Sequence, residues 1–214
     1  MSVTQDQTSG EPHWTRYDAS VRPAGLILML HGGKDRSQQL VDSRSLSWRR
    51  SAAMQRDIAR RAQEADASIW LLRFTSRGWN GGAARIADAR RALDAVRREL
   101  GEIPVVLLGH SMGARVAVHV ADDPNVRGVV ALAPWLPPGE SVAALAGKQL
   151  YAAHGTRDRI TSARATADYV RRAAVVASRA ELADMGPVGH YLLRNRAAWN
   201  DVALTSSLQV LGTA

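Results

Sequence analysis

The sequence contains no cysteine, which excludes disulfide bonds and thiolate metal sites. Because disulfides mark oxidising compartments, we expect a cytoplasmic location. The sequence also lacks any apolar run near the roughly 18 residues that cross a bilayer. Its polar first residues do not have the basic and apolar segments of a secretory signal. These absences predict a protein without a membrane partner.

A compact basic tract with interleaved aromatic residues is missing too, although the chain has 28 Lys and Arg against 20 Asp and Glu. The arginines are scattered, usually in pairs among Asp and Glu on helix-like segments such as residues 83–100. Charge pairs of this kind are typical of solvated helix faces. We therefore expect no nucleic-acid partner.

Motifs for metals and phosphate-bearing cofactors are absent as well. The six histidines form no H-E-x-x-H or H-x-H pattern of the kind that binds zinc. The "GGK" at residues 32–34 lacks the earlier glycine of a phosphate-binding loop, because Leu28 stands at that position. We expect neither a metal nor a cofactor.

Short apolar runs alternate with segments of helical periodicity along most of the chain. Continuous apolar strands between helices are typical of a parallel sheet with helices on both faces. The pattern predicts a flexible lead-in over residues 1–13 and a single α/β domain over residues 14–214, with one doubly wound, mostly parallel sheet. Strands are expected at 24–30, 67–74, 103–109, 126–134, 148–155 and 178–186, with an edge strand at 14–19, and helices at 48–65, 83–100, 112–121, 162–176 and 196–211.

Glycines, histidines and reactive side chains directly follow four of these strands. They form "HGG" at 31–33, "GHSMG" at 109–113, "HGTRD" at 154–158 and "GPVGH" at 186–190. The carboxyl ends of parallel strands meet at one edge of a sheet, and ligands bind there. We therefore expect Ser111, Asp158 and His190 to lie close together.

The symmetric glycines of "GHSMG" indicate a tight turn from strand to helix with Ser111 at its apex. A residue at such an apex adopts a strained backbone, usually with positive φ. The strand and the helix approach so closely that the residues two positions before and after the apex have no room for a β-carbon. Gly109 and Gly113 occupy these positions. The turn would lift the Ser111 hydroxyl above the sheet.

These residue types are those of nucleophilic catalysis. His190 would remove the Ser111 proton during attack on a carbonyl carbon, and Asp158 would hold the imidazole in the useful tautomer. The developing oxyanion needs two backbone N–H donors. We assign them to Met112, directly after the serine, and to Gly33, in the loop after the first central strand.

Some of these roles have competing candidates. Asp184 lies closer to His190 in the sequence than Asp158 does, and is the alternative acid. Asp168 falls in a helical pattern and is expected to be solvated. Three histidines next to the loops are predicted to be structural, the first of them by shaping its loop through hydrogen bonds: His31, His110 and His154.

Signals for the substrate site are weaker. Arg36 and Arg77 could bind an anionic group of a substrate, although arginine is abundant throughout. Two of the candidate wall residues, the tryptophans, could equally seal the upper core. The candidate walls are Trp79, Trp135, Leu136 and the loop at 34–48.

In element order and in the four motifs, residues 14–212 resemble the α/β-hydrolase fold family. The chain keeps the family's order of serine, acid and histidine. Family members often insert a helical cap between two late strands, and residues 135–147 are too few for one. The chain is most similar to small capless members, either dienelactone-hydrolase-like or esterase-like. Dienelactone hydrolases themselves use a cysteine nucleophile, which this sequence lacks.

The resemblance implies a serine hydrolase that cleaves a small carboxylic ester, thioester or lactone through an acyl-enzyme. Its partner would be a small acyl substrate. Two alternatives stay open. One is acyl transfer or amide cleavage on the same fold, and the other is a non-catalytic binding protein that retains the serine turn.

Overall fold

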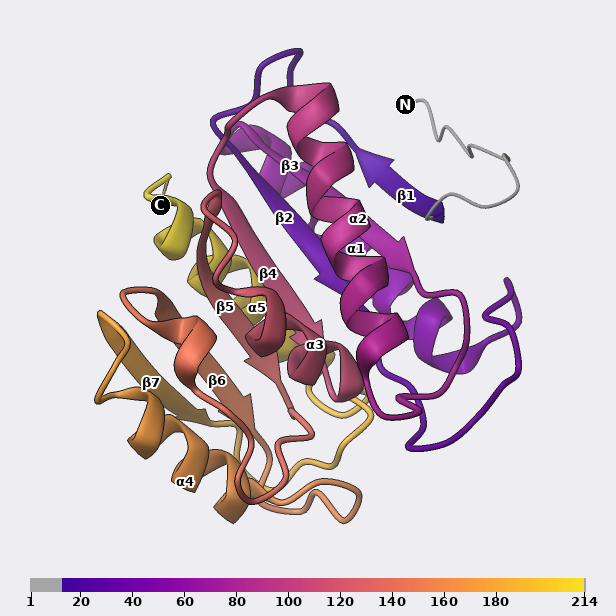
Figure 1. Ribbon diagram of the computed structural model, residues 1–214, viewed down its shortest axis with the longest axis vertical. Coiled ribbons are helices and arrows are strands. Elements are labelled where there is room, and N and C mark those ends of the chain that lie inside the picture. Colours follow the sequence, from indigo (N-terminus) through magenta and orange to yellow (C-terminus); the bar gives the residue numbers. More distant parts are fainter. Residues whose placement is uncertain (1–12, 214) are drawn as a thin grey trace.

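A seven-stranded sheet forms the centre of the fold in a computed structural model, which describes residues 13–213 (Figure 1). The strand order is β1-β3-β2-β4-β5-β6-β7, in which β1 is antiparallel to β3 and all other neighbours are parallel. The mostly parallel sheet predicted from the sequence is confirmed. The strands are β1 His13–Tyr17, β2 Gly25–Leu30, β3 Ala67–Arg73, β4 Val105–His110, β5 Val126–Leu132, β6 Gln149–His154 and β7 Arg179–Asp184.

Among the described residues, five α-helices cover the two faces of this sheet (Figure 1). One face packs against α2 (Ala83–Leu100), α3 (Met112–Val120) and α4 (Ala163–Ala173). The other packs against α1 (Leu46–Glu64) and α5 (Arg196–Leu211). This is the doubly wound arrangement that the alternation of strands and helices predicted.

The central strand β2 shows why the buried strands are continuously apolar. Leu26, Leu28 and Leu30 belong to the core on the α2 and α3 side, whereas Ile27 and Met29 belong to the core on the α1 and α5 side. Because helices cover both faces, a polar side chain at any of these positions would be buried without a partner. The edge strand β7 is mostly exposed, which explains its weaker apolar pattern.

The observed elements lie within a few residues of the predicted ones. β1 begins at His13, one residue before the predicted start of the domain. β4 begins at Val105 instead of residue 103, since Pro104 has no N–H for the sheet ladder. Between β5 and β6 the chain forms one short 3-10 helix, Ala143–Leu145, and no cap domain. Within residues 13–213, no helix is long and apolar enough to span a bilayer.

The first turn of α3 lies against the end of β2. A β-carbon on Gly113 would lie 2.0 Å from the carbonyl oxygen of Leu30, far inside van der Waals contact. A β-carbon on Gly109 would lie 2.4 Å from the Cα atom of Ala114. The prediction that both positions lack room for a β-carbon is confirmed, and their glycines allow α3 to begin directly beyond β4.

We expect Gly113→Ala to lower the free energy of unfolding by roughly 2–3 kcal/mol. Alanine is favoured over glycine in a helix by about 1 kcal/mol, but the collision here is with a backbone oxygen that cannot rotate away. Urea unfolding followed by circular dichroism measures the effect. Gly189→Ala is the control, because its β-carbon would meet only the Arg157 oxygen, at 3.7 Å. Equal unfolding midpoints for the two variants would contradict the close contact.

Candidate active site

Ser111 occupies the apex of the turn between β4 and α3. Its φ of 54° and ψ of −116° form a strained backbone for a residue with a side chain. Hydrogen bonds hold this conformation on both sides. The Ser111 N–H donates to the Leu132 carbonyl at 3.1 Å, and the Ser111 carbonyl accepts from the Trp135 N–H at 3.2 Å. The positive φ predicted for the apex is confirmed.

Three side chains from separate loops form one hydrogen-bonded chain. The Ser111 hydroxyl lies 3.0 Å from Nε2 of His190, and Nδ1 of the same ring lies 2.8 Å from Oδ2 of Asp158. Since Nδ1–H donates to the carboxylate, Nε2 is left to accept the serine proton. Ser111 and His190 are each 6% exposed. The structure thus brings together the three residues that were expected to meet.

The Asp158 carboxylate accepts hydrogen bonds from several donors at once. Its side chain is fully buried, and Nε2 of His154 lies 3.2 Å from Oδ2. The Thr161 hydroxyl donates to the same oxygen at 2.9 Å, and the N–H groups of Ile160 and Thr161 donate to Oδ1. Burial alone would raise the pKa of Asp158, but these hydrogen bonds outweigh it and hold the pKa well below its usual range. The carboxylate therefore stays ionised beside His190.

Two of these contacts were not identified from the sequence. His154 was predicted to be structural, yet its ring bonds directly to the acid, while its Nδ1 lies 2.8 Å from the Thr166 hydroxyl. Thr161 follows Asp158 by three residues, a spacing at which an Asp side chain often accepts from the backbone. That spacing was the available signal for Thr161. No pattern in the sequence indicates that the His154 ring points toward Asp158.

The competing acids lie elsewhere. Asp184, at the end of β7, is exposed, and its carboxylate accepts a hydrogen bond from Gly186 in its own loop. Asp168 lies on α4 and pairs with Arg171 at 2.8 Å. Neither carboxylate contacts His190, so the geometry selects Asp158 as its partner.

The two residues assigned as oxyanion donors, Met112 and Gly33, lie close to Ser111. Met112 is the first residue of α3, where N–H groups have no partner within the helix. Gly33 follows β2 and lines the same cleft as Ser111. A β-carbon on Gly33 would lie 2.5 Å from both the Arg77 carbonyl oxygen and the Met112 side chain, so the packing of this loop requires glycine. The two residues assigned as oxyanion donors are therefore neighbours in space.

Two buried histidines flank the site in their neutral form. His31 donates from Nδ1 to the Gly32 carbonyl at 2.7 Å and accepts from the Phe74 N–H at 3.2 Å, which is the loop-shaping role predicted for it. Burial lowers the pKa of His31 to about 4. Burial, together with the charge of His190, lowers the pKa of His110 to about 3. Among the described residues, no three His, Asp or Glu side chains cluster as a metal site.

Ser111 and His190 open into a cleft with a volume of about 550 Å³. Part of its wall comes from the loop at 34–48, as predicted. Of the two arginines that were considered for an anionic group, Arg77 lines the cleft and Arg36 lines a separate hollow. Two of the bulky wall residues were not identified as functional from the sequence. They are Tyr191, which directly follows His190, and Arg50, which lies among several arginines of α1 and has no distinguishing signal in the sequence.

Trp79, Trp135 and Leu136, which were predicted to bind substrate, do not line this cleft, and Trp79 lines the separate hollow that also contains Arg36. Leu136 is buried in the core on the α2 and α3 side. The two indole rings lie against the Arg115 guanidinium, whose Cζ atom is 4.2 Å and 4.6 Å from their centroids. Cation–π contact and core packing therefore explain these side chains. The alternative interpretation, that the tryptophans seal the upper core, agrees with the structure.

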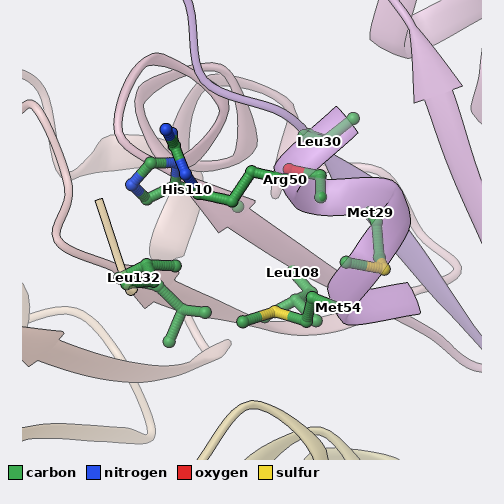
Figure 2. Close-up of a pocket in the computed structure, with 10 residues that line it drawn as sticks. Met29, Leu30, Arg50, Met54, Leu108, His110 and Leu132 are labelled. Carbon is green, nitrogen blue, oxygen red and sulfur yellow. The ribbon is translucent and has the colours of Figure 1, made fainter. Parts of the chain in front are cut away.

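A much smaller cavity adjoins the cleft at Arg50 and His110 (Figure 2). Apolar side chains such as Met54 and Leu108 form most of its wall. Its volume is about 10 Å³, close to the space that one water molecule needs. This cavity has no room for an acyl chain.

Solved structures with similar folds include serine hydrolases and esterases. XC6422 from Xanthomonas campestris, described as an a/b serine hydrolase without lid, has 16% identity over 92% of this chain and 88% of its own, with a TM-score of 0.70. A serine hydrolase homologue from Coxiella burnetii has 13% identity over 96% of both chains, with a TM-score of 0.71. An esterase from Thermogutta terrifontis has 14% identity over 99% of this chain and 93% of its own, with a TM-score of 0.71. These structural similarities show that the chain shares its fold with these proteins.

The sequence itself was also compared with curated proteins and with models of protein families. No curated protein matches the sequence significantly. The model of the alpha/beta hydrolase family, however, matches residues 27–211, from β2 to the end of α5. The matched region contains Ser111, Asp158 and His190. The chain therefore belongs to the alpha/beta hydrolase family.

Proposed function

We propose that this protein is a serine hydrolase that cleaves a small carboxylic ester, thioester or lactone through an acyl-enzyme intermediate. The observation that carries the proposal is the hydrogen-bonded chain from Ser111 through His190 to Asp158. The ionised carboxylate orients the imidazole, and the imidazole lies within hydrogen-bonding distance of the hydroxyl. A binding protein would need neither this alignment nor the strained backbone at Ser111.

In the first half-reaction, Oγ of Ser111 attacks the carbonyl carbon of the substrate while Nε2 of His190 takes the hydroxyl proton. The N–H groups of Met112 and Gly33 donate to the resulting oxyanion, and each such donor lowers the barrier by roughly 3 kcal/mol. His190 then gives its proton to the leaving alcohol or thiol. In the second half-reaction, His190 deprotonates a water molecule, which attacks the acyl carbon. The bond from the acyl carbon to Oγ of Ser111 then breaks, and the imidazolium returns its proton to that oxygen.

Two features support hydrolysis of a small substrate. The chain between β5 and β6 forms no cap, so water reaches the cleft freely. The cavity that adjoins the cleft is too small for an acyl tail. Among the proteins of similar fold, the Thermogutta terrifontis esterase is described with bound butyrate and as phosphonylated by cyclosarin. We propose that the site around Ser111 likewise binds short acyl groups and reacts with phosphonylating reagents.

We expect a fluorophosphonate probe to label the wild-type protein, and Ser111→Ala to abolish the labelling. A serine hydroxyl displaces fluoride from phosphorus at a useful rate only when a neighbouring base activates it. In-gel fluorescence and intact mass spectrometry measure the adduct. An unlabelled wild-type protein with a normal circular dichroism spectrum would contradict the proposal and favour a binding protein that retains the serine turn.

Asp158→Asn is expected to lower kcat for 4-nitrophenyl acetate by roughly 10³–10⁴-fold, because a neutral amide no longer fixes the imidazole tautomer or stabilises the imidazolium. Asp184→Asn makes the same chemical change at an exposed acid, the last residue of the neighbouring strand β7, and we expect kcat to stay close to the wild-type value. Stopped-assay kinetics of both variants, each checked for folding, measure the difference. The reverse ranking would overturn Asp158 as the acid.

A further inference from the structure

The cleft that contains Ser111 is lined by basic side chains. Lys34, Arg44, Arg50 and Arg77 contribute to its wall, and no Asp or Glu does so among the described residues. The arginine excess of the whole chain does not by itself produce such an arrangement. Elsewhere, most partly buried arginines are paired with carboxylates, as in the contacts of α2 and α3 with neighbouring loops, although Arg73 instead lies over the Trp48 ring.

The four basic groups differ in their partners. Arg77 lies 3.2 Å from Asp42, which offsets its charge, and it also donates to the Leu40 carbonyl. Lys34 and Arg44 are exposed, and neither forms an ion pair with any residue of the described range. Arg50 pairs with no carboxylate of residues 13–213 either, so within that range three positive charges at the cleft have no counter-ion.

Arg50 is the most confined of the three. Its side chain is half-buried, its Nε atom is shielded from solvent, and no residue from 13 to 213 accepts a hydrogen bond from that atom. Figure 2 shows the Arg50 side chain extending toward the His110 ring, above apolar side chains. Burial lowers the pKa of Arg50, in agreement with an environment that disfavours its charge. The guanidinium of Arg50 therefore has a hydrogen-bond donor that lacks an acceptor in a partly desolvated place, which is energetically unfavourable.

Ring contacts connect Arg50 to the reacting groups. Its Cζ atom lies 4.7 Å from the centroid of the Tyr191 ring. That ring lies 5.4 Å from the imidazole of His190, which bonds to Ser111. His110 lies on the other side of Arg50. Because its ring is neutral, it neither repels the Arg50 guanidinium nor competes with it for an anion. A group bound to Arg50 is thus held at the same cleft as an ester bond presented to Ser111.

We propose that the substrate carries an anionic group, a carboxylate or a phosphate, which Arg50 binds while Lys34 and Arg44 attract it into the cleft. This inference rests on the proposed hydrolase function. A guanidinium that is partly desolvated and unpaired destabilises the free protein, and an anion in the cleft would offset that cost through a charge-assisted hydrogen bond. The planar fork of arginine suits both carboxylate and phosphate oxygens.

The test compares anionic esters with neutral esters, and the acyl-side pair is also matched in chain length. The acyl-side pair is 4-nitrophenyl hydrogen glutarate and 4-nitrophenyl valerate. On the leaving-group side, 3-acetoxybenzoate and acetylated 3-hydroxyphenyl phosphate are each compared with phenyl acetate. The measured quantity is the ratio of kcat/KM for the anionic ester to kcat/KM for its neutral partner. We expect a ratio above one on at least one side, and the side and anion with the higher ratio identify where the charge of the substrate lies.

Variants then assign the preference to one side chain. Arg50→Met should lower the ratio by roughly 10- to 100-fold, the effect of losing a hydrogen bond to a charged group, and Arg50→Lys should restore part of it. Arg49→Met is the matched control, because it removes one positive charge from the preceding position of α1. The Arg49 side chain is exposed and does not line the cleft. This control should keep the wild-type ratio.

The outcomes separate this inference from the proposed function. Hydrolysis of the neutral esters with no preference for any anionic ester would overturn the inference and leave the hydrolase proposal intact. Equal ratios in Arg50→Met and Arg49→Met would also overturn it. If Arg50→Met does not fold, the wild-type ratio still decides, since 0.5 M NaCl should lower it by screening the cleft. Failure of fluorophosphonate labelling, together with no turnover of any ester, would instead remove the proposed function.

Discussion

The contact between the first turn of α3 and the end of β2 determines where the reacting groups lie. With a hydrogen atom in place of a side chain at Gly113, the helix can approach the Leu30 carbonyl oxygen directly. This approach forces Ser111 into positive φ, and the hydrogen bonds of its N–H and carbonyl maintain the strain. It also places the N–H of Met112 beside the loop that follows β2. One steric relation thus positions both the hydroxyl and the two proposed oxyanion donors.

The other half of the site depends on two loops at the opposite part of the sheet. The loop after β6 provides Asp158, and the loop after β7 provides His190. Backbone hydrogen bonds join these loops, since the Thr156 N–H donates to the Gly186 carbonyl at 2.8 Å and the Arg157 N–H donates to the Val188 carbonyl at 3.2 Å. The imidazole is therefore oriented by the carboxylate and by a shared loop framework. Neither β6 nor β7 would hold it correctly alone.

Sequence reasoning identified what depends on chain order and local sterics, and it missed what depends on the direction of long side chains. The parallel sheet, the Ser111 turn and the meeting of Ser111, Asp158 and His190 follow from periodicity, from glycine positions and from the common edge of parallel strands. Trp79 and Trp135 also follow strand ends, but stacking on Arg115 turns them away from the cleft wall. Arg50 reaches the cleft from near the start of a regular helix, where periodicity does not distinguish it from neighbouring arginines.

The basic side chains of the cleft and the buried Asp158 have opposite electrostatic effects on the His190 imidazole. Unpaired cations at the cleft would favour a developing oxyanion, but they would also oppose the positive charge that His190 has to carry during the proposed reaction. Asp158 is the group that compensates. Hydrogen bonds from His154, Thr161 and the backbone keep it ionised despite complete burial, so its negative charge stays next to the imidazole. If the cleft attracts anions as proposed, His190 can therefore still act as the base of the proposed reaction, because the hydrogen bonds to Asp158 keep that carboxylate charged.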